Sequence, residues 1–444
     1  MEYKPKYYVD SATVRENLSN HMLVDGFDIV LDLAKSNSKL VDARTGKEYI
    51  DMFTNFASVP VRMNHPKMDT PEFIEYIGKI AINKIANSDI YTDVFATFVN
   101  TFFKVAVPPY FKYAFFIEGG GLAVENALKA AIDWKVRKNI AAGKGEKGTK
   151  IIHFKDSFHG RTGYTMSLTN TDINKVALFP KFDWPRIINP KINFPETPEN
   201  IAKTIETEKI ALKEINEAFA NNPDEIAGII LETIQGEGGD NHFRPEFLQE
   251  LRKIADEKEV MLIFDEVQCG LGITGTFWAH QQFGVKPDII SFGKKMQVCG
   301  ILVTERIDEV PDNVFKKSSR INSTWGGNIV DMARSTRYLE IIEEEKLVEN
   351  AKIMGEYLKD NLIKLEKEYP NVITAIRGRG LFCAFDFIDK DTEVRNKFIN
   401  KCHEKGLLIL PCGKNSIRFR PALDVKKEYI DTAMIILRDV LKCL

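Results

Sequence analysis

The chain has 444 residues, with 61 Lys and Arg against 63 Asp and Glu, so its formal net charge is −2. Hydrophobic residues make up 44 % and charged residues 28 %, which is typical of globular proteins and excludes a mainly disordered chain. The length indicates two or three domains. The balanced charge does not indicate binding to nucleic acid or to an anionic membrane.

The N-terminal stretch MEYKPKYYVD lacks the apolar segment of a secretory signal, and no apolar run is long enough for a membrane span. The six cysteines show no CxxC spacing, and the seven histidines are dispersed. This pattern predicts a cytoplasmic protein with free thiols, and it predicts no metal site.

From residue 114 onward, short apolar runs alternate with helical patterns such as 123–138 and 247–258. The runs are continuously apolar, as in strands that are buried on both faces. They lie at 114–117, 151–154, 226–231, 260–264 and 289–292. The alternation predicts an α/β fold, with a large domain whose mainly parallel sheet carries helices on both faces.

The pattern changes near residue 329, where a smaller α+β domain is predicted. Its expected elements are helices at 329–345 and 350–369 and strands at 381–387, 406–410 and 416–419. Residues 1–60 show only short mixed stretches and are not expected to fold alone. We therefore predict an N-terminal segment (1–70) that joins the small domain, a large domain (71–328) and a C-terminal small domain (329–444).

Three different chemical groups follow three of the predicted strands. The first strand is followed by Glu118 and three glycines, the strand at 260–264 by Asp265, and the strand at 289–292 by Gly293, Lys294 and Lys295. Because ligands bind beyond the carboxyl ends of parallel strands, we expect these groups to meet at one sheet edge. Taken singly, each group also has a purely structural explanation. The glycines can form a tight turn, Asp265 can cap the next segment, and the lysines can be surface residues.

Together, the three groups match the requirements of pyridoxal 5'-phosphate (PLP). Glycine N–H groups at a helix N-terminus hold a phosphate, and a buried carboxylate keeps the pyridinium nitrogen protonated. A lysine amine forms the Schiff base and later transfers protons. We therefore predict PLP as the cofactor, with Asp265 and either Lys294 or Lys295 as catalytic residues.

Seven motifs resemble the fold-type I, class III aminotransferases, which act on ω-amino acids. In chain order they are GGGLAVENALKAA, FHGRTGY, ETIQGEGGD, LIFDEVQCGLGITG, DIISFGKK, NSTWGGN and SIRFRP, between residues 119 and 421. Weaker similarity at 51–66 extends the resemblance toward the N-terminus. Within the class, ENALKAAIDWK, FGKKMQVCG and NSTWGGN are most similar to the members that transfer the ε-amino group of L-lysine.

The resemblance implies a role for each matching cofactor-binding residue. The Schiff-base lysine of the family follows Phe-Gly, which selects Lys294. Asp265 would contact the pyridine nitrogen, and Gln268 would contact the phenolic oxygen of the ring. Gly120 and Gly121 would bind the phosphate through their backbone N–H groups.

The resemblance also implies a homodimer with shared active sites. Most of the class carries hydroxyl residues where this chain has glycines, so Thr324 becomes more important for the phosphate. In the family, the equivalent threonine reaches the phosphate from the other subunit. Asn322 would line the same entrance and bind substrate. Phe158 would stack on the cofactor ring, and its neighbour His159 is not assigned a catalytic role.

Substrate carboxylates need cations, and arginine is the favoured one. By resemblance, Arg161 binds the carboxylate of L-lysine, and Arg418 binds the α-carboxylate of 2-oxoglutarate, whereas Arg420 is interpreted as structural. Glu237 would neutralise Arg418 while lysine is bound and move away when the keto acid arrives. The implied products are L-glutamate and 2-aminoadipate 6-semialdehyde, which cyclises to piperideine-6-carboxylate.

Two departures from the class pattern and three alternatives remain. Ile273 replaces the arginine that is usual after DEVQ, a change shared with lysine-specific relatives. Arg62 stands near the substrate entrance where relatives carry glycine, which leaves ornithine or 4-aminobutyrate as alternative donors. Residues 270–275 spell GxGxxG, the pattern of a Rossmann dehydrogenase, although these glycines begin five residues past the strand. The third alternative is a catalytically inactive, carboxylate-binding relative.

Overall fold

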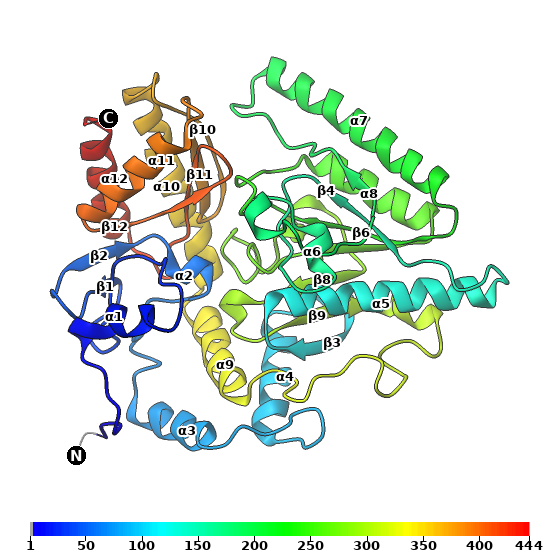
Figure 1. Ribbon diagram of the computed structural model, residues 1–444, viewed down its shortest axis with the longest axis horizontal. Coiled ribbons are helices and arrows are strands. Elements are labelled where there is room, and N and C mark those ends of the chain that lie inside the picture. The colour runs from blue at the N-terminus through cyan, green and yellow to red at the C-terminus, as the bar shows by residue number, and fades with distance from the viewer. Residues whose placement is uncertain (1–2, 444) are drawn as a thin grey trace.

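The computed structural model describes residues 3–443, which form three sheets with helices packed around them (Figure 1). The largest sheet has the strand order β3 (Phe111–Ile117), β9 (Cys299–Thr304), β8 (Ile289–Phe292), β7 (Met261–Asp265), β6 (Ile226–Glu232), β4 (Lys150–Phe154) and β5 (Arg186–Ile187). All neighbours from β8 to β5 pair in parallel, and only β9 runs antiparallel to both of its neighbours. The predicted α/β fold with a mainly parallel sheet is confirmed.

Side chains alternate between the two faces of this sheet, which explains why its strands are apolar throughout. Ile263 packs in the same cluster as helix α5 (Gly120–Ala141), whereas Leu262 and Phe264 pack with helix α8 (Pro245–Glu257) on the other face. Every residue of β6 and β7 is buried. The sheet is thus covered on both sides, and only its ends remain accessible to a ligand.

The C-terminal part contains a four-stranded antiparallel sheet. Its strand order is β10 (Ile373–Arg379), β11 (Phe382–Phe387), β14 (Ser416–Phe419) and β13 (Leu410–Cys412). Its helices are α9 (Ile329–Glu344), α10 (Leu347–Glu368), α11 (Thr392–Glu404) and α12 (Lys427–Leu441). The predicted strand at 406–410 is split, because β12 (Leu407–Leu408) belongs to a different sheet from β13.

The third sheet joins the two ends of the chain. Strand β2 (Glu48–Asp51) pairs with β1 (Lys39–Val41) on one side and with β12 on the other. The N-terminal segment therefore packs with the C-terminal part, as Figure 1 shows in blue and orange. The boundaries at residues 70 and 328 stay a prediction.

Further helices complete the described part of the chain. They are α1 (Val14–Ser19), α2 (Thr54–Ala57), α3 (Pro71–Ala81), α4 (Asp93–Val105), α6 (Thr165–Leu168) and α7 (Pro198–Asn221), with 3₁₀ turns at Ser11–Thr13, Ile173–Lys175, Ala279–Phe283, Lys294–Met296 and Glu305–Glu309. Within residues 3–443, we find no helix with the length and apolarity that a membrane crossing requires.

A buried ion pair ties the C-terminal sheet to the loop after β6. The guanidinium of Arg420, just beyond β14, donates to Asp240 at 2.6 and 2.9 Å, and both side chains are almost fully buried. We expect Asp240→Asn to lower the free energy of unfolding by about 3–5 kcal/mol, because it leaves a buried charge without its partner.

Chemical denaturation of the Asp240→Asn variant and of the unmodified protein measures this effect. Glu199→Gln is the matched control, because it breaks the exposed Lys203–Glu199 pair and should leave the unfolding transition unchanged. Equal losses of stability in the two variants would contradict the role given to the buried pair.

Candidate active site

The strand register brings the predicted polar groups to one sheet edge. Asp265, the last residue of β7, pairs with Glu232 of β6 on one side and with Ser291 of β8 on the other. Strand β3 points in the same direction, because β9 is antiparallel both to β3 and to β8. The glycines after β3 and Lys294 after β8 therefore lie at the carboxyl edge with Asp265, as predicted.

A cavity of about 440 Å³ opens at this edge. It is lined by nine of the predicted site residues: Gly120, Gly121, Phe158, Arg161, Glu237, Asp265, Gln268, Lys294 and Arg418. The same wall includes Phe56, His159, Thr162 and Glu232, to which the sequence gave no role. Asn322 and Thr324 are absent from the wall of this cavity.

The glycines form a cradle suited to a phosphate. Helix α5 begins at Gly120, so the N–H groups of its first turn have no partner within the helix. Gly121 lies close to the opposite wall, because a Cβ added there would meet the Thr162 Cγ2 at 3.3 Å. Backbone N–H groups without side chains thus face the cavity at the positive end of helix α5. This arrangement suits an anionic group.

Asp265 is held rigidly at the base of the cavity. Its Oδ1 accepts hydrogen bonds from Ser291 Oγ at 3.0 Å and from the Val267 N–H at 3.1 Å. The His159 Nδ1–H donates to its Oδ2 at 2.8 Å, and both side chains are buried. His159 is therefore a positioning residue for Asp265, which the sequence did not reveal because the two are 106 positions apart.

The two neighbouring lysines, Lys294 and Lys295, lie in different environments. Lys294 lines the cavity, and burial lowers the pKa of its amine, with Arg418 and Arg420 adding to the effect. The amine of Lys295 instead donates to the carbonyls of Ala57 and Gln268 at 3.1 and 3.0 Å. Lys294 also has a left-handed backbone with φ of 52°, a strain that is typical of functional sites.

Gln268 is oriented by two arginines. Its Oε1 accepts hydrogen bonds from Arg418 at 3.2 Å and from Arg420 at 3.0 Å, and its amide N–H₂ has no acceptor among the described residues. Gly236 permits this arrangement, because a Cβ there would lie 2.2 Å from Gln268 Oε1. The amide of Gln268 is thus prepared to donate to an acceptor such as a phenolic oxygen.

The two predicted substrate-binding arginines differ in environment. Arg418 is buried, and its Nε has no hydrogen-bond partner among the described residues. Arg161 is exposed at the cavity wall and makes no hydrogen bond or ion pair within residues 3–443. Both guanidinium groups therefore retain donors for a carboxylate.

Glu237 is not paired with Arg418 in this structure. Its carboxylate accepts a hydrogen bond from Thr171 Oγ1 at 2.7 Å and forms an ion pair with Lys175. The predicted Glu237–Arg418 pair would require the carboxylate to exchange partners, and this movement stays a prediction. The 62-residue separation of Lys175 from Glu237 explains why the sequence did not suggest their contact.

Glu232 supports two segments of the wall. Its carboxylate accepts the backbone N–H of Phe158 at 2.9 Å and that of Gly236 at 3.0 Å. Full burial raises the pKa of Glu232 to about 7, although the nearby His159 opposes the increase. Glu232 thus connects the predicted ring-stacking residue to the loop that carries Glu237.

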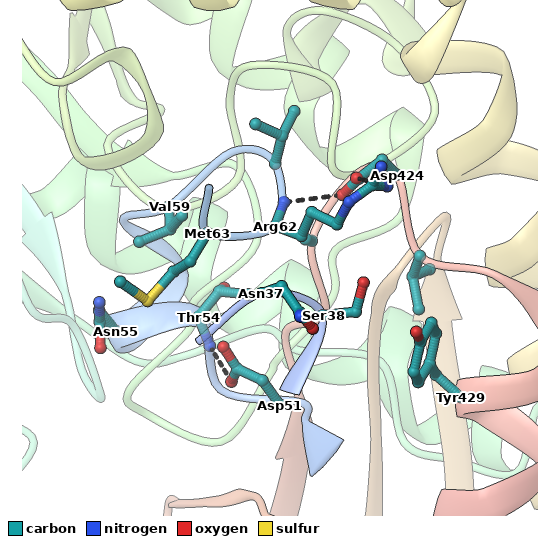
Figure 2. Close-up of a pocket in the computed structure, with 13 residues that line it drawn as sticks. Asn37, Ser38, Asp51, Thr54, Asn55, Val59, Arg62, Met63, Asp424 and Tyr429 are labelled. Atoms are coloured by element: carbon teal, nitrogen blue, oxygen red, sulfur yellow. Dashed lines mark hydrogen bonds and ion pairs between the residues drawn. The ribbon is translucent and has the colours of Figure 1, made fainter. Parts of the chain in front are cut away.

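Arg62 lies in a separate, smaller pocket beside this site (Figure 2). Its guanidinium and its backbone N–H donate to Asp424 at 2.7 and 2.9 Å. Asp424 thus holds the guanidinium in place, and the expected position of Arg62 near the substrate entrance stays a prediction. Arg62 does not line the cavity that contains Lys294.

A left-handed turn places Phe56 in the cavity wall. Four consecutive residues, 54–57, have φ between 42° and 61°, which costs roughly 1–2 kcal/mol per residue. The Asp51 carboxylate accepts the N–H groups of Phe53 and Thr54, and Thr54 Oγ1 donates to the Arg420 carbonyl at 2.7 Å. These bonds hold the strained turn against the base of the site.

Asn322 and Thr324 do not line the cavity of their own chain. The Thr324 carbonyl accepts a hydrogen bond from Ser88 at 3.3 Å, and the Asn322 side chain caps its own loop at the Ser323 N–H. Their predicted roles therefore stay predictions, which would require the second subunit that the resemblance implies.

Residues 270–275 do not form a nucleotide-binding turn. Gly272 and Gly275 approach Val348, Leu423 and Lys352 of the C-terminal part instead of opening a long helix after a strand. The Rossmann dehydrogenase alternative is therefore wrong.

Comparison with known proteins agrees with this arrangement. The family model "Aminotransferase class-III" matches residues 24–441. The chain therefore belongs to the class-III aminotransferase family. This confirms the resemblance drawn from the seven motifs and, because the family is PLP-dependent, the predicted cofactor.

Individual members of the family differ in how similar they are to this chain. The chain is 50 % identical over 431 residues to an L-lysine-epsilon aminotransferase of Mycobacterium tuberculosis, which covers 96 % of this chain and 95 % of the relative. A solved structure of lysine aminotransferase from M. tuberculosis in the internal aldimine form superimposes with a TM-score of 0.95 at 48 % identity, covering 98 % and 100 % of the two chains. A mitochondrial 4-aminobutyrate aminotransferase of Sus scrofa is 31 % identical, with 90 % and 82 % covered.

Proposed function

We propose that this chain transfers the ε-amino group of L-lysine to 2-oxoglutarate, giving 2-aminoadipate 6-semialdehyde and L-glutamate. The main support is one cavity that combines Lys294 and Asp265 with two arginines whose donors remain available. The greater similarity to lysine enzymes than to a 4-aminobutyrate enzyme favours lysine as the donor.

Each residue has a distinct task in this proposal. When bound, PLP supplies an electron sink for the carbon from which a proton is removed. Lys294 carries this proton, because its amine faces the cavity and has a lowered pKa. Asp265 keeps the ring nitrogen protonated through a carboxylate that His159 and Ser291 hold in place.

The arginines select carboxylates at two places in the cavity. Arg161 binds the carboxylate of lysine, so that the ε-amine at the far end of the substrate reaches the reacting position. Arg418 binds the α-carboxylate of 2-oxoglutarate after Glu237 has moved away from it. Phe158 stacks on the ring, and Gly120 and Gly121 hold the phosphate through their N–H groups.

We further propose a homodimer in which Asn322 and Thr324 of the partner subunit complete each site. Neither residue lines the cavity of its own chain, and the neighbouring Trp325 is 38 % exposed. For the compartment we propose the cytoplasm, which agrees with the six free cysteines.

Steady-state assays with three donors test the substrate. L-lysine, L-ornithine and 4-aminobutyrate are each supplied with 2-oxoglutarate, and glutamate formation is measured. We expect the highest kcat/KM for lysine, with a product that o-aminobenzaldehyde traps as the cyclised semialdehyde. A higher value for either of the other donors would replace lysine but keep the mechanism.

Replacing Glu237 by alanine tests the proposed exchange of partners. We expect the preference for lysine over L-glutamate as the amino donor to fall by about 10-fold, because Arg418 would then always be free to bind an α-carboxylate. The ratio of the two kcat/KM values measures this preference. Glu196→Ala, at a more distant glutamate, serves as the control, and an unchanged ratio in Glu237→Ala would argue against the exchange.

A further inference from the structure

Glu237 is held from outside the cavity by a lysine that is not part of the cavity wall. Lys175 ends the short 3₁₀ turn Ile173–Lys175, and its ammonium pairs with the Glu237 carboxylate. The same ammonium lies 5.7 Å from the centre of the Phe158 ring. One cation thus contacts both the mobile carboxylate of the proposed mechanism and the predicted stacking residue.

Glu237 differs from the other two carboxylates of the cavity. Asp265 is fixed by His159 and Ser291, and Glu232 is fixed by two backbone N–H groups. Glu237, in contrast, is bound only by the side chains of Thr171 and Lys175 among the described residues. It is therefore the carboxylate whose position changes most easily.

The negative charge of Glu237 acts on two cations of the site, Arg418 and Lys294. It raises the pKa values of Arg418 and Lys294, opposing the effect of their burial. A carboxylate that turns toward Arg418 would neutralise this arginine, and one that stays with Lys175 leaves the arginine free. The partner of Glu237 thus sets how strongly the cavity attracts a second substrate carboxylate.

The two proposed substrates respond differently to this charge. L-lysine carries one carboxylate and two amino groups, whereas 2-oxoglutarate carries two carboxylates. A Glu237 charge directed at Arg418 therefore weakens the binding of 2-oxoglutarate and does little to the carboxylate of lysine at Arg161.

We propose that Lys175 is a positioning residue that holds Glu237 away from Arg418 and thereby favours the half-reaction with 2-oxoglutarate. This proposal rests on the proposed function. The side chains of Lys175 and Glu237 are 31 % and 23 % exposed, so solvent screens their attraction, and breaking the pair costs little free energy. The carboxylate can therefore exchange Lys175 for Arg418 during each catalytic cycle.

The test is the Lys175→Met variant, which keeps the length of the side chain but removes its charge. We expect the KM for 2-oxoglutarate to rise about fivefold, with the KM for lysine unchanged or lower and kcat at saturation nearly unchanged. Lys175→Arg should restore the original KM. Lys191→Met is the matched control, because Lys191 is a partly exposed lysine that pairs with Asp156 instead of Glu237.

A double-mutant cycle separates this role from a structural one. In a Glu237→Ala background, Lys175→Met should no longer change the KM for 2-oxoglutarate. An unchanged KM in the single variant, or equal increases for both substrates, would overturn the proposal. If Lys175→Met does not fold, Lys175→Gln is measured against the same criteria.

The proposed function is tested separately, by the donor assays with the unmodified enzyme. A failure to transaminate lysine would show there, in the donor assays. The Lys175 measurements would then use the donor that is active, because their criterion is the KM of the keto acid.

Discussion

Replacing Lys294 by alanine is expected to lower kcat by on the order of 10⁴-fold or more, because no other lysine among residues 3–443 lines the cavity. The proton of the substrate carbon would then have no acceptor at the reacting position. The visible absorbance of bound cofactor should also change, since its covalent attachment to the protein is lost. Single-turnover reaction with L-lysine, followed by absorbance, measures both effects.

Lys295 supplies the control for this experiment. Its amine is buried and donates to two carbonyls, and burial lowers its pKa to about 7, with the charge of Lys294 contributing. We expect Lys295→Met to be less stable and yet to retain the cofactor band and the reaction. The opposite result, with turnover kept by Lys294→Ala and lost by Lys295→Met, would show that the catalytic lysine is assigned wrongly.

Asp265→Asn is expected to give the second-largest loss, about 10²–10³-fold in kcat. Asparagine has nearly the same shape and can still accept from Ser291 and Val267, but it lacks the negative charge. Without this charge the ring nitrogen loses its proton, and the cofactor becomes a weaker electron sink. Steady-state kinetics with saturating lysine and 2-oxoglutarate measure the loss.

His159→Gln is the companion variant, because it keeps the charge of Asp265 and alters only the side chain that orients it. Its loss should be clearly smaller than that of Asp265→Asn. Equal losses in the two variants would mean that the orientation of the carboxylate matters as much as its charge. A fully active Asp265→Asn enzyme would remove Asp265 from the mechanism.

The sequence allowed the carboxyl edge of the sheet to be predicted almost completely. Apolar runs identified β6, β7 and β8, and the residue that follows each run falls at the common edge because parallel strands align their ends. Strand β9 escaped prediction, because its run directly follows the lysine turn and is antiparallel. Helix α7 also escaped prediction, and its mixed, largely polar sequence gives it only a narrow buried stripe.

Contacts between distant segments were the part that sequence reasoning missed. His159, Glu232 and Lys175 each have a partner that lies 62 to 106 positions away, namely Asp265, Phe158 and Glu237, and no local pattern encodes such contacts. Phe56 reaches the wall only because Asp51 stabilises a left-handed turn that sequence propensity disfavours. The ion pair of Arg62 was missed for the same reason, because its partner Asp424 lies 362 positions away.

The most direct test of the account is an absorbance spectrum of the purified protein before and after addition of L-lysine alone. We predict a visible band of bound PLP that is replaced by the shorter-wavelength band of pyridoxamine 5'-phosphate, because lysine has donated its ε-amino group. Adding 2-oxoglutarate should then restore the visible band. A protein that shows no visible band even after PLP is added, or a band that lysine leaves unchanged, would contradict the assignment.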